Sequence, residues 1–187
     1  MDKQTVMKVV RSVSSASGKS MTASSLSTSV GNSPAAIECR KFYGTRDQFL
    51  TTFNPSNQLT YCRRDCLERI MLGKAPTLTT VEQAYGKGCA ESWMEIQLKN
   101  LVNYVGCQER VTSAMIETTA AVIVAEFGFL KVTEIMLFML RLKSGQFGSV
   151  YGKTDGLRIT IALRDFLRYR AVTLDLIEMR RKGEGHF

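Results

Sequence analysis

Seven residues, Gly148 to Thr154, come close to the sequence of a phosphate-binding P-loop. A P-loop has four residues between its first glycine and the Gly-Lys-Thr, because its backbone N–H groups wrap around the phosphates. Here three residues separate Gly148 from Gly152, and the segment follows a helical pattern rather than a buried β-strand. We therefore do not expect nucleotide hydrolysis from this loop.

Metal and acid–base chemistry have few candidate residues. The one histidine is His186, so catalytic triads and metal sites built on several histidines are excluded. Cys62 and Cys66 could supply two zinc ligands, but no second close cysteine pair accompanies them. Four glutamates fall on helices expected to be buried and could form an acid pair: Glu95, Glu117, Glu126 and Glu134. We expect a non-enzymatic protein without a metal or cofactor, and an enzyme with buried carboxylates stays as a remaining alternative.

Arginine and lysine side chains near the C-terminus give the clearer functional signal. Arg164 and Arg168 lie one turn apart on the expected last helix, and a guanidinium group donates two hydrogen bonds at once to a phosphate. The alternative interpretation is that these arginines pair with Asp165 and other carboxylates. The predicted nucleic-acid-binding residues are Arg141, Lys143, Lys153, Arg158, Arg164, Arg168 and Arg170.

The net charge of +8 is divided unevenly along the chain. Residues 1–76 carry a net charge of +6, residues 77–140 of −3 and residues 141–187 of +5. Clustered lysines and arginines favour binding to a polyanion, because they release its counterions. The same charge is typical of an ordinary solvated basic surface, so the pattern leaves both interpretations open.

The elements that would position these residues are helices. Pro34 can occupy the first turn of a helix, and a second short helix begins near Asp47. Four longer helices are expected over about residues 80–104, 113–127, 130–143 and 156–182. Because no alternating strand pattern is present, the sequence predicts an all-α, single-domain helical bundle over residues 34–183.

Two of the longer helices carry a local signal. Thr79 and Glu82 have the spacing of a capping box, which predicts the start of the helix over residues 80–104. Residues 113–127 are apolar nearly all round, and this pattern predicts a central, buried helix.

The N-terminal residues differ in composition from the rest of the chain. Residues 12–33 contain ten serines and almost no large apolar side chains, so they cannot offset the entropy lost on ordering. We expect residues 1–33 to be a disordered tail, with an organellar transit peptide as the alternative. The absence of a long apolar run argues against a membrane span, and an odd count of five cysteines favours a reducing, cytoplasmic setting.

A motif joins the last two expected helices. It runs from Glu134 through an apolar stretch to Lys143, continues through a glycine-rich loop to Asp155, and is followed by Leu163-Arg164-Asp165-Phe166. With Tyr85-Gly86 and Trp93 ahead of it, this block resembles a family of uncharacterised small proteins found in bacterial genomes and their mobile elements, over about residues 76–170. The positions that match the motif are Glu134, Gly145, Gly148, Tyr151, Gly152 and Asp155.

This resemblance implies a prokaryotic or phage-like origin, and it carries over neither an enzyme activity nor an active site. Family members often have Asp-Pro where this chain has Asp155-Gly156. We predict a non-enzymatic DNA-binding or replication-accessory protein of a phage or mobile element, such as a helicase partner, that uses the glycine loop and the last helix. The alternative is a protein–protein adaptor or a small homo-oligomeric structural protein that does not bind nucleic acid.

Overall fold

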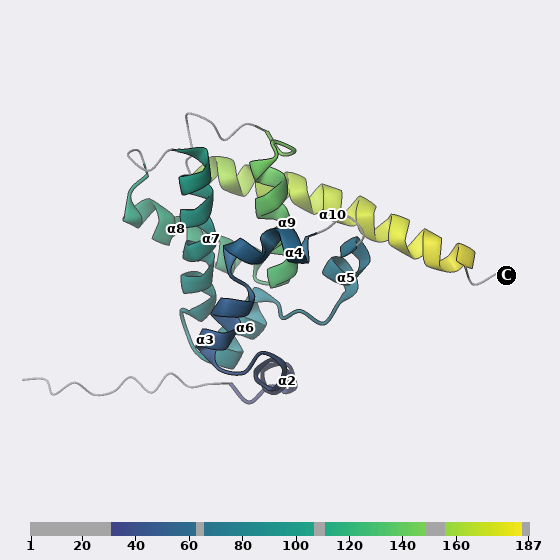
Figure 1. Cartoon of the computed structure of the whole chain (residues 1–187), viewed down its shortest axis with the longest axis horizontal. Helices are drawn as coiled ribbons and strands as arrows, with labels where there is room; N and C mark the ends of the chain where they lie inside the picture. The colour runs from purple at the N-terminus through teal and green to yellow at the C-terminus, as the bar shows by residue number, and fades with distance from the viewer. Residues whose placement is uncertain (1–30, 63–65, 107–110, 149–155, 185–187) are drawn as a thin grey trace, which may run out of the picture.

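The computed structural model describes residues 31–62, 66–106, 111–148 and 156–184. Within these ranges the regular structure is helical, with one isolated bridge between Thr77 and Lys131 and no strand. The predicted all-α fold is therefore confirmed. The helices shown in Figure 1 are α2 (Pro34–Tyr43), α3 (Arg46–Thr52), η1 (Pro55–Asn57), α4 (Gln58–Tyr61), α5 (Leu67–Leu72), α6 (Leu78–Tyr85), α7 (Cys89–Val105), α8 (Ser113–Phe127), α9 (Val132–Lys143) and α10 (Gly156–Glu184).

Residues 31–33, expected to be the end of a disordered tail, belong to the folded part of the protein. The N–H of Gly31 donates to the carbonyl of Gln83 at 2.8 Å. The Ser33 hydroxyl accepts from the N–H of Ala36 at 3.2 Å and caps α2. These polar contacts compensate for the lack of apolar side chains. The rest of the expected tail, residues 1–30, lies outside the described residues.

The single helix expected over residues 80–104 is in fact two helices, α6 and α7. Gly86 and Gly88 have φ angles of 95° and 83°, a conformation that glycine adopts without strain, and they turn the chain between the two helices. The carboxylate of Glu82 accepts from the N–H groups of Gly88 and Ala90, both at 2.7 Å. Glu82 therefore caps the following helix rather than its own.

The predicted capping box at Thr79 is also wrong. The residue that caps α6 is Thr77, whose hydroxyl accepts from the N–H of Thr80 at 3.1 Å. The hydroxyl of Thr79 instead donates to the carbonyl of Gly128 at 3.0 Å. Thr79 is thus used for a long-range contact that joins α6 to the end of α8.

Helix α9 forms the centre of the core. Every residue from Val132 to Met139 is buried, and α9 packs against α4, α5, α7 and α10. Helix α8, which was expected to be central, lies at the side: Ile116, Ala120 and Ile123 are buried, while Val122 is exposed. Much of its outer face consists of alanine and threonine, whose short side chains cost little to leave in water.

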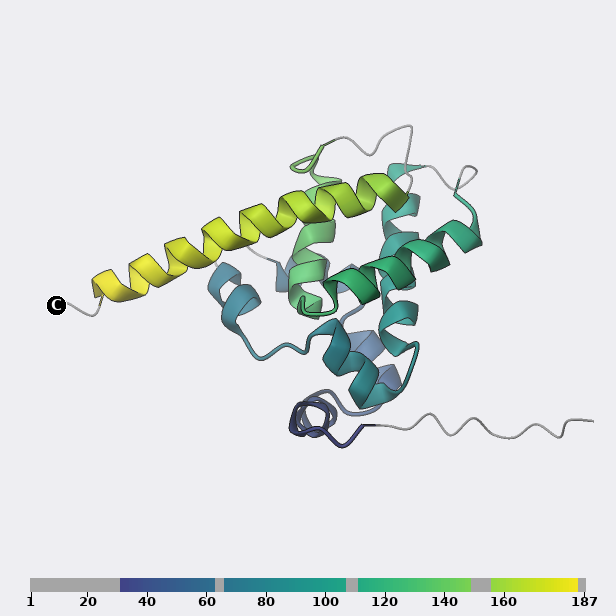
Figure 2. The same ribbon diagram turned by 180° about the vertical axis from the view of Figure 1, so that it is seen from behind.

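Helix α10 is the longest element, with 29 residues. Its first half packs on α8 and α9 through the buried side chains Ile159, Leu163 and Phe166. Its second half extends past the other helices (Figures 1 and 2) and contacts α5, where Arg181 hydrogen-bonds to Glu68. The first half of the helix is thus packed on the core, while the second half is held at α5, where Thr173 and Ile177 are buried, and projects beyond it.

Candidate functional site

The solvent-exposed side of α10 carries arginines of the predicted binding surface. Arg164 is exposed and has no ion pair with another described residue. One turn later, the side chain of Arg168 is 83% exposed, and its Nη1 lies 2.7 Å from Oδ1 of Asp165. Arg158, at the start of the helix, is exposed and takes part in an interaction within the chain. Arg164 and Arg168 are thus both exposed, and Arg168 forms the ion pair with Asp165 that the alternative interpretation predicted.

Arg170 has a structural role instead. Its Nε donates to Oε1 of Glu134 at 2.7 Å, and the Glu134 side chain is fully buried. The other oxygen of Glu134 accepts from the N–H of Lys131 at 2.9 Å at the start of α9. A buried carboxylate needs such a partner, so Arg170 is not free to bind phosphate, and its assignment to the nucleic-acid surface is corrected.

The side chain of Lys143 is also half-buried and forms hydrogen bonds within the protein. Its Nζ donates to Oε1 of Gln58 at 2.7 Å and to Oδ1 of Asn100, and it lies 5.7 Å from the ring centre of Tyr104. All three neighbours are uncharged, and burial lowers the pKa of Lys143. The lysine links α9 to α4 and α7, so its assignment as a phosphate contact is also corrected.

Behind Lys143 a chain of buried hydrogen bonds continues through the core. Gln58 Nε2 donates to Oε1 of Gln97 at 2.8 Å, and Gln97 Nε2 donates to the carbonyl of Phe53 at 3.0 Å. The indole N–H of Trp93 donates to the same carbonyl at 2.9 Å. Every buried polar side-chain atom among the described residues has a partner, so this network is a satisfied structural feature.

The first part of the glycine loop packs back on the helices that it follows. Phe147 lies 5.9 to 6.1 Å, between ring centres, from Phe138, Phe166 and Tyr169. The guanidinium of Arg141 lies 6.0 Å from the ring centre of Tyr169 and is half-buried. Gly145 and Gly148 both have positive φ, which fits glycine. The remaining predicted loop positions lie outside the described residues: Tyr151, Gly152, Lys153 and Asp155.

The four candidate glutamates are used separately rather than as an acid pair. Glu95 pairs with Lys99 at 3.0 Å, and Glu134 pairs with Arg170. Glu117 and Glu126 are exposed on α8. Among the described residues, no group of three or more His, Cys, Asp or Glu side chains is placed to hold a metal ion. The glutamates therefore support no acid–base site of the expected kind.

Cys39, Cys62 and Cys89 are core residues, Cys66 is half-buried, and Cys107 lies outside the described residues. Burial raises the pKa of Cys62 to about 12 and also raises the pKa of Cys39 and Cys89, so these thiols stay protonated at neutral pH. Cys66 accepts a hydrogen bond from Nη2 of Arg69 at 3.3 Å. Protonated, buried thiols and the hydrogen bond of Cys66 to Arg69 do not favour a zinc site at Cys62 and Cys66.

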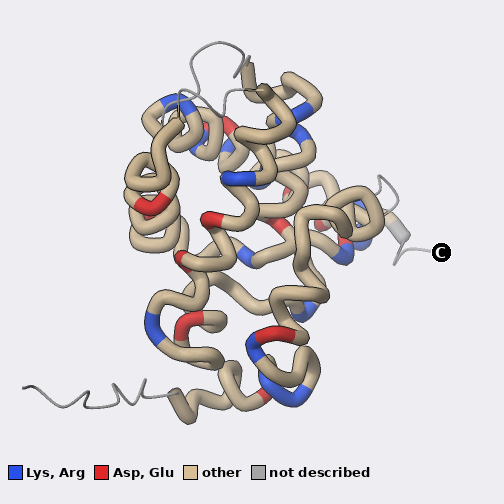
Figure 3. The backbone as a smooth tube through the Cα atoms, turned by 60° about the vertical axis from the view of Figure 1, so that its left-hand side comes forward, with Lys and Arg blue, Asp and Glu red and all other residues tan. Residues whose placement is uncertain are grey.

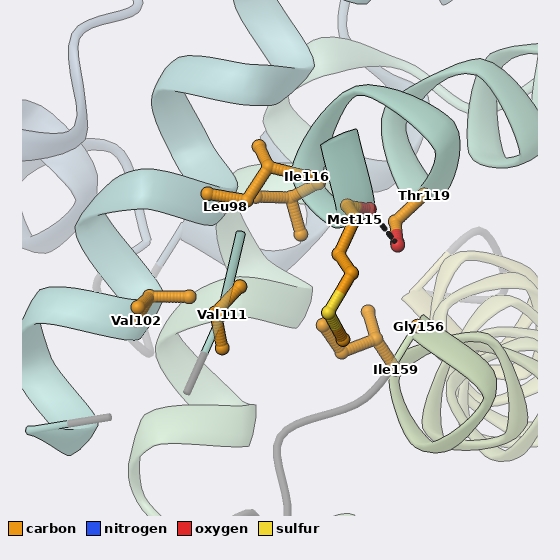
Figure 4. A pocket seen from close by; sticks show the side chains of 8 residues that line it. All are labelled: Leu98, Val102, Val111, Met115, Ile116, Thr119, Gly156 and Ile159. Carbon is orange, nitrogen blue, oxygen red and sulfur yellow. Dashed lines mark hydrogen bonds between the residues drawn. The ribbon is translucent and has the colours of Figure 1, made fainter. Parts of the chain in front are cut away.

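A small cavity lies between α7, α8 and α10. Figure 4 shows that its walls are mainly apolar, and its volume of about 10 Å³ is close to that of a single water position. Gly156 and Thr119 meet at this cavity, because a Cβ on Gly156 would lie 2.4 Å from Oγ1 of Thr119. The cavity marks a close contact of two helices and is too small for a ligand.

A surface hollow of about 260 Å³ lies over α2, α4 and α5. Its lining includes the aromatic side chains of Tyr43, Phe53 and Tyr61, whose neighbouring ring centres are 5.0 and 5.6 Å apart. Arg69 and Lys74 also line it. Aromatic faces beside cationic side chains can stack a planar group and neutralise its charge.

The feature that sequence reasoning missed is an apolar stripe on the outside of α10. Five large apolar side chains on this helix are between 50% and 69% exposed: Leu157, Ile161, Val172, Leu176 and Met179. They lie on a different side of the helix from the packed residues Ile159, Leu163 and Phe166. The intervals of four and three residues between Val172, Leu176 and Met179 could have revealed a second apolar side.

Comparison with known proteins places the candidate surface within a family match. Residues 110–183 match the family of unknown function DUF6633. This range includes α8, α9 and α10, and hence the glycine loop and the whole outer face of the last helix. The match supports the resemblance to an uncharacterised family, while Tyr85-Gly86 and Trp93 lie outside it. Comparisons with curated proteins and with solved structures gave no match.

Two further observations concern the surface as a whole. In the described part of the chain, no helix combines the length and the apolar character needed to cross a bilayer. In Figure 3 the backbone positions of lysines and arginines are interspersed with those of acidic residues along the described part of the chain.

Proposed function

We propose that this chain is a non-enzymatic accessory protein that acts by presenting the outer face of α10 to a protein partner. We define the outer face as Leu157, Ile161, Asp165, Arg168, Val172, Leu176 and Met179. The exposed apolar stripe carries this proposal, because soluble proteins seldom leave a row of large apolar side chains in water unless the row binds something. A helix that projects from its domain is also accessible from several sides.

Of the two functions expected from the sequence, nucleic-acid binding receives less support from the structure than a protein–protein adaptor does. Arg170 and Lys143 are tied into the core, so the predicted nucleic-acid surface loses two of its members. Along the described part of the chain, lysine and arginine positions are interspersed with acidic ones, which gives less support to strong counterion release. The adaptor, which was the alternative, now has the better support.

Nucleic-acid contact is the second candidate function. It is favoured by Arg164, which is exposed without an ion pair to another described residue, and by the hollow in which Arg69 and Lys74 lie near the half-buried rings of Tyr43 and Tyr61. We propose a replication partner and a mobile-element origin on the resemblance of the glycine-loop motif. Neither the identity of the partner nor the origin of the protein changes our proposal that the outer face of α10 is the contact surface.

The proposal is tested with a photo-reactive side chain placed on the stripe. Leu176 is replaced by benzoylphenylalanine in the full chain, which is expressed in the organism that carries it, and cross-linked species are identified after irradiation. We expect an adduct of defined mass from position 176. The matched control is the same replacement at Leu59, which is 70% exposed on α4. Equal yields from the two positions would contradict the proposal.

A further inference from the structure

We infer that the partner on the outer face of α10 is a second copy of this chain, which lies antiparallel to the first. This inference rests on the proposed function, because it uses the same surface and names its occupant. It follows from the spacing of the apolar residues along α10 and from the position of one ion pair between them.

The outer face has a symmetrical order of residue types. An α-helix turns 100° per residue, so the seven residues of this face fall within a stripe about 100° wide that runs straight along the helix. Leu157 and Ile161 form an apolar patch at one end, and Val172, Leu176 and Met179 form another at the other end. The ion pair of Asp165 and Arg168 lies between the two patches.

A two-fold axis midway between Asp165 and Arg168 brings these groups together. Leu157 and Leu176 lie equally far from that axis in sequence, as do Ile161 and Val172. In an antiparallel pair, Leu157 of one copy therefore lies at the level of Leu176 of the other, and Ile161 lies at the level of Val172. Each contact occurs twice, as in any isologous interface.

The charges favour this direction of pairing over the parallel one. About the same axis, Asp165 of each copy lies at the level of Arg168 of the other, so four charges alternate in sign across the centre. A parallel pair in register would place Asp165 beside Asp165 and Arg168 beside Arg168, and like charges directly opposite each other are unfavourable. Charge complementarity therefore selects the antiparallel arrangement.

The available area predicts a reversible dimer. Five apolar side chains per copy, each at least half exposed, line a helix of 29 residues, which is about 43 Å long. A contact between two single helices of this length lies near the lower end of the size range of specific interfaces. We expect a dissociation constant in the range of about 1 to 100 μM.

The first test is sedimentation velocity of the purified full chain at concentrations from about 1 to about 200 μM. We expect a shift from monomer to dimer over this range. Leu176→Glu should weaken the dimer at least tenfold, while the matched control Leu59→Glu should not change it. A chain that stays monomeric throughout overturns the inference; a cross-link from position 176 to a different protein would still support the proposed function.

The second test exchanges the charges at the centre of the outer face, at Asp165 and Arg168. Asp165→Arg alone places arginines opposite one another, Arg168→Asp alone places aspartates opposite one another, and each variant should dimerise at least tenfold more weakly. Mixing the two variants restores attraction, so we expect heterodimers of wild-type strength or stronger. If either variant formed homodimers with unchanged affinity, the inference that the two outer faces pair around Asp165 and Arg168 would be overturned.

Cysteine cross-linking fixes the direction of the pair. Under mild oxidation, a mixture of Ile161→Cys and Val172→Cys chains should give a disulfide-linked dimer of the two different chains. The wild-type chain, treated in the same way, controls for its own cysteines. A Val172→Cys chain that links to itself in high yield, with no link to Ile161→Cys, would overturn the antiparallel arrangement.

Discussion

Arg170 on α10 reaches Glu134 on α9 with its Nε 2.7 Å from a carboxylate oxygen that is fully buried. The two residues are 36 positions apart in the sequence, and their pairing fixes the last helix against the centre of the core. Glu134 also accepts from the N–H of Lys131, and within the described part of the chain Arg170 is the cation that forms an ion pair with this carboxylate.

Removal of Arg170 should destabilise the fold strongly. In Arg170→Ala, Glu134 keeps its buried position and loses its ion-pair partner, which costs about 3 to 5 kcal/mol in comparable proteins. Urea denaturation followed by circular dichroism measures the change in the free energy of unfolding. Arg168→Ala is the matched control, and because its ion pair is exposed we expect a change below about 1 kcal/mol. A loss of similar size in both variants would contradict the structural role of Arg170.

The double variant Glu134→Met with Arg170→Met separates the pair from its surroundings. With both charges replaced by apolar side chains, no buried charge remains without a partner. We expect the double variant to be more stable than Arg170→Ala, by about 1 kcal/mol or more, in the same urea experiment. If it were the less stable of the two, the loss in Arg170→Ala would have to come from packing rather than charge.

Gly156 should be sensitive to the smallest possible side chain. In Gly156→Ala the new Cβ would lie 2.4 Å from Oγ1 of Thr119, so α10 or α8 must shift, at a cost of about 1 to 3 kcal/mol. Adding Thr119→Ala removes the clashing oxygen and should recover most of the loss. Gly183→Ala is the control on the same helix: nothing lies within 4 Å of its Cβ, and we expect stabilisation of about 0.5 to 1 kcal/mol. Thermal unfolding of these three variants and of the wild type measures the three changes in stability.

Lys143 should make stability depend on alkaline pH. Burial holds the pKa of Lys143 below its usual value of 10.5, so in the window between the two values the unfolded chain binds more protons than the folded chain. Stability contributed by Lys143 therefore rises with pH through that window and is flat below it. The measurement is the difference in unfolding free energy between the wild type and Lys143→Met from neutral pH to about pH 10. We expect this difference to move in favour of the wild type as pH rises, while a constant difference would contradict it.

Nucleic-acid binding, if it occurs, should depend on Arg164 and on salt. Fluorescence anisotropy with single-stranded and duplex oligonucleotides should show affinity that falls as the salt concentration rises. Arg164→Glu should weaken binding and reduce the slope of log affinity against log salt by about 1. Lys87→Glu makes the same change of charge at an exposed position between α6 and α7 and is the control. Equal effects of the two variants would mean that only net charge matters.

Local signals in the sequence located several helices well. Pro34 begins α2 as expected, and Thr112 caps α8 by accepting from the N–H of Met115. The run of apolar residues around Ile135 correctly predicted a buried α9. Helix caps and apolar periodicity depend on neighbours within a few residues, so they can be recognised without the fold.

The errors arose where a residue's partner lies beyond its own helical turn, from 6 positions away for Glu82 to 49 positions away for Thr79. Glu82 and Thr79 have the right spacing for a capping box, yet their partners are Gly88 and Ala90 in one case and Gly128 in the other. The same holds for Arg170, because a basic helix face looks alike in sequence whether its arginine faces water or a buried carboxylate. Of the predicted binding residues, Arg164 and Arg168 are exposed, while Arg170 and Lys143 are held by contacts within the protein; nucleic-acid binding by this set stays a prediction.

The position of Arg170 within α10 has a consequence for the length of the projecting half. Fourteen residues of the helix precede Arg170 and fourteen follow it, so the buried ion pair lies at the midpoint. Sliding the helix by one turn along α9 would separate Arg170 from Glu134, and this cost fixes the register of the helix. If the loop before α10 became longer or shorter, the loop and the first half of the helix would have to adjust. The number of residues between Arg170 and the end of the helix, and hence how far the second half reaches, would stay the same.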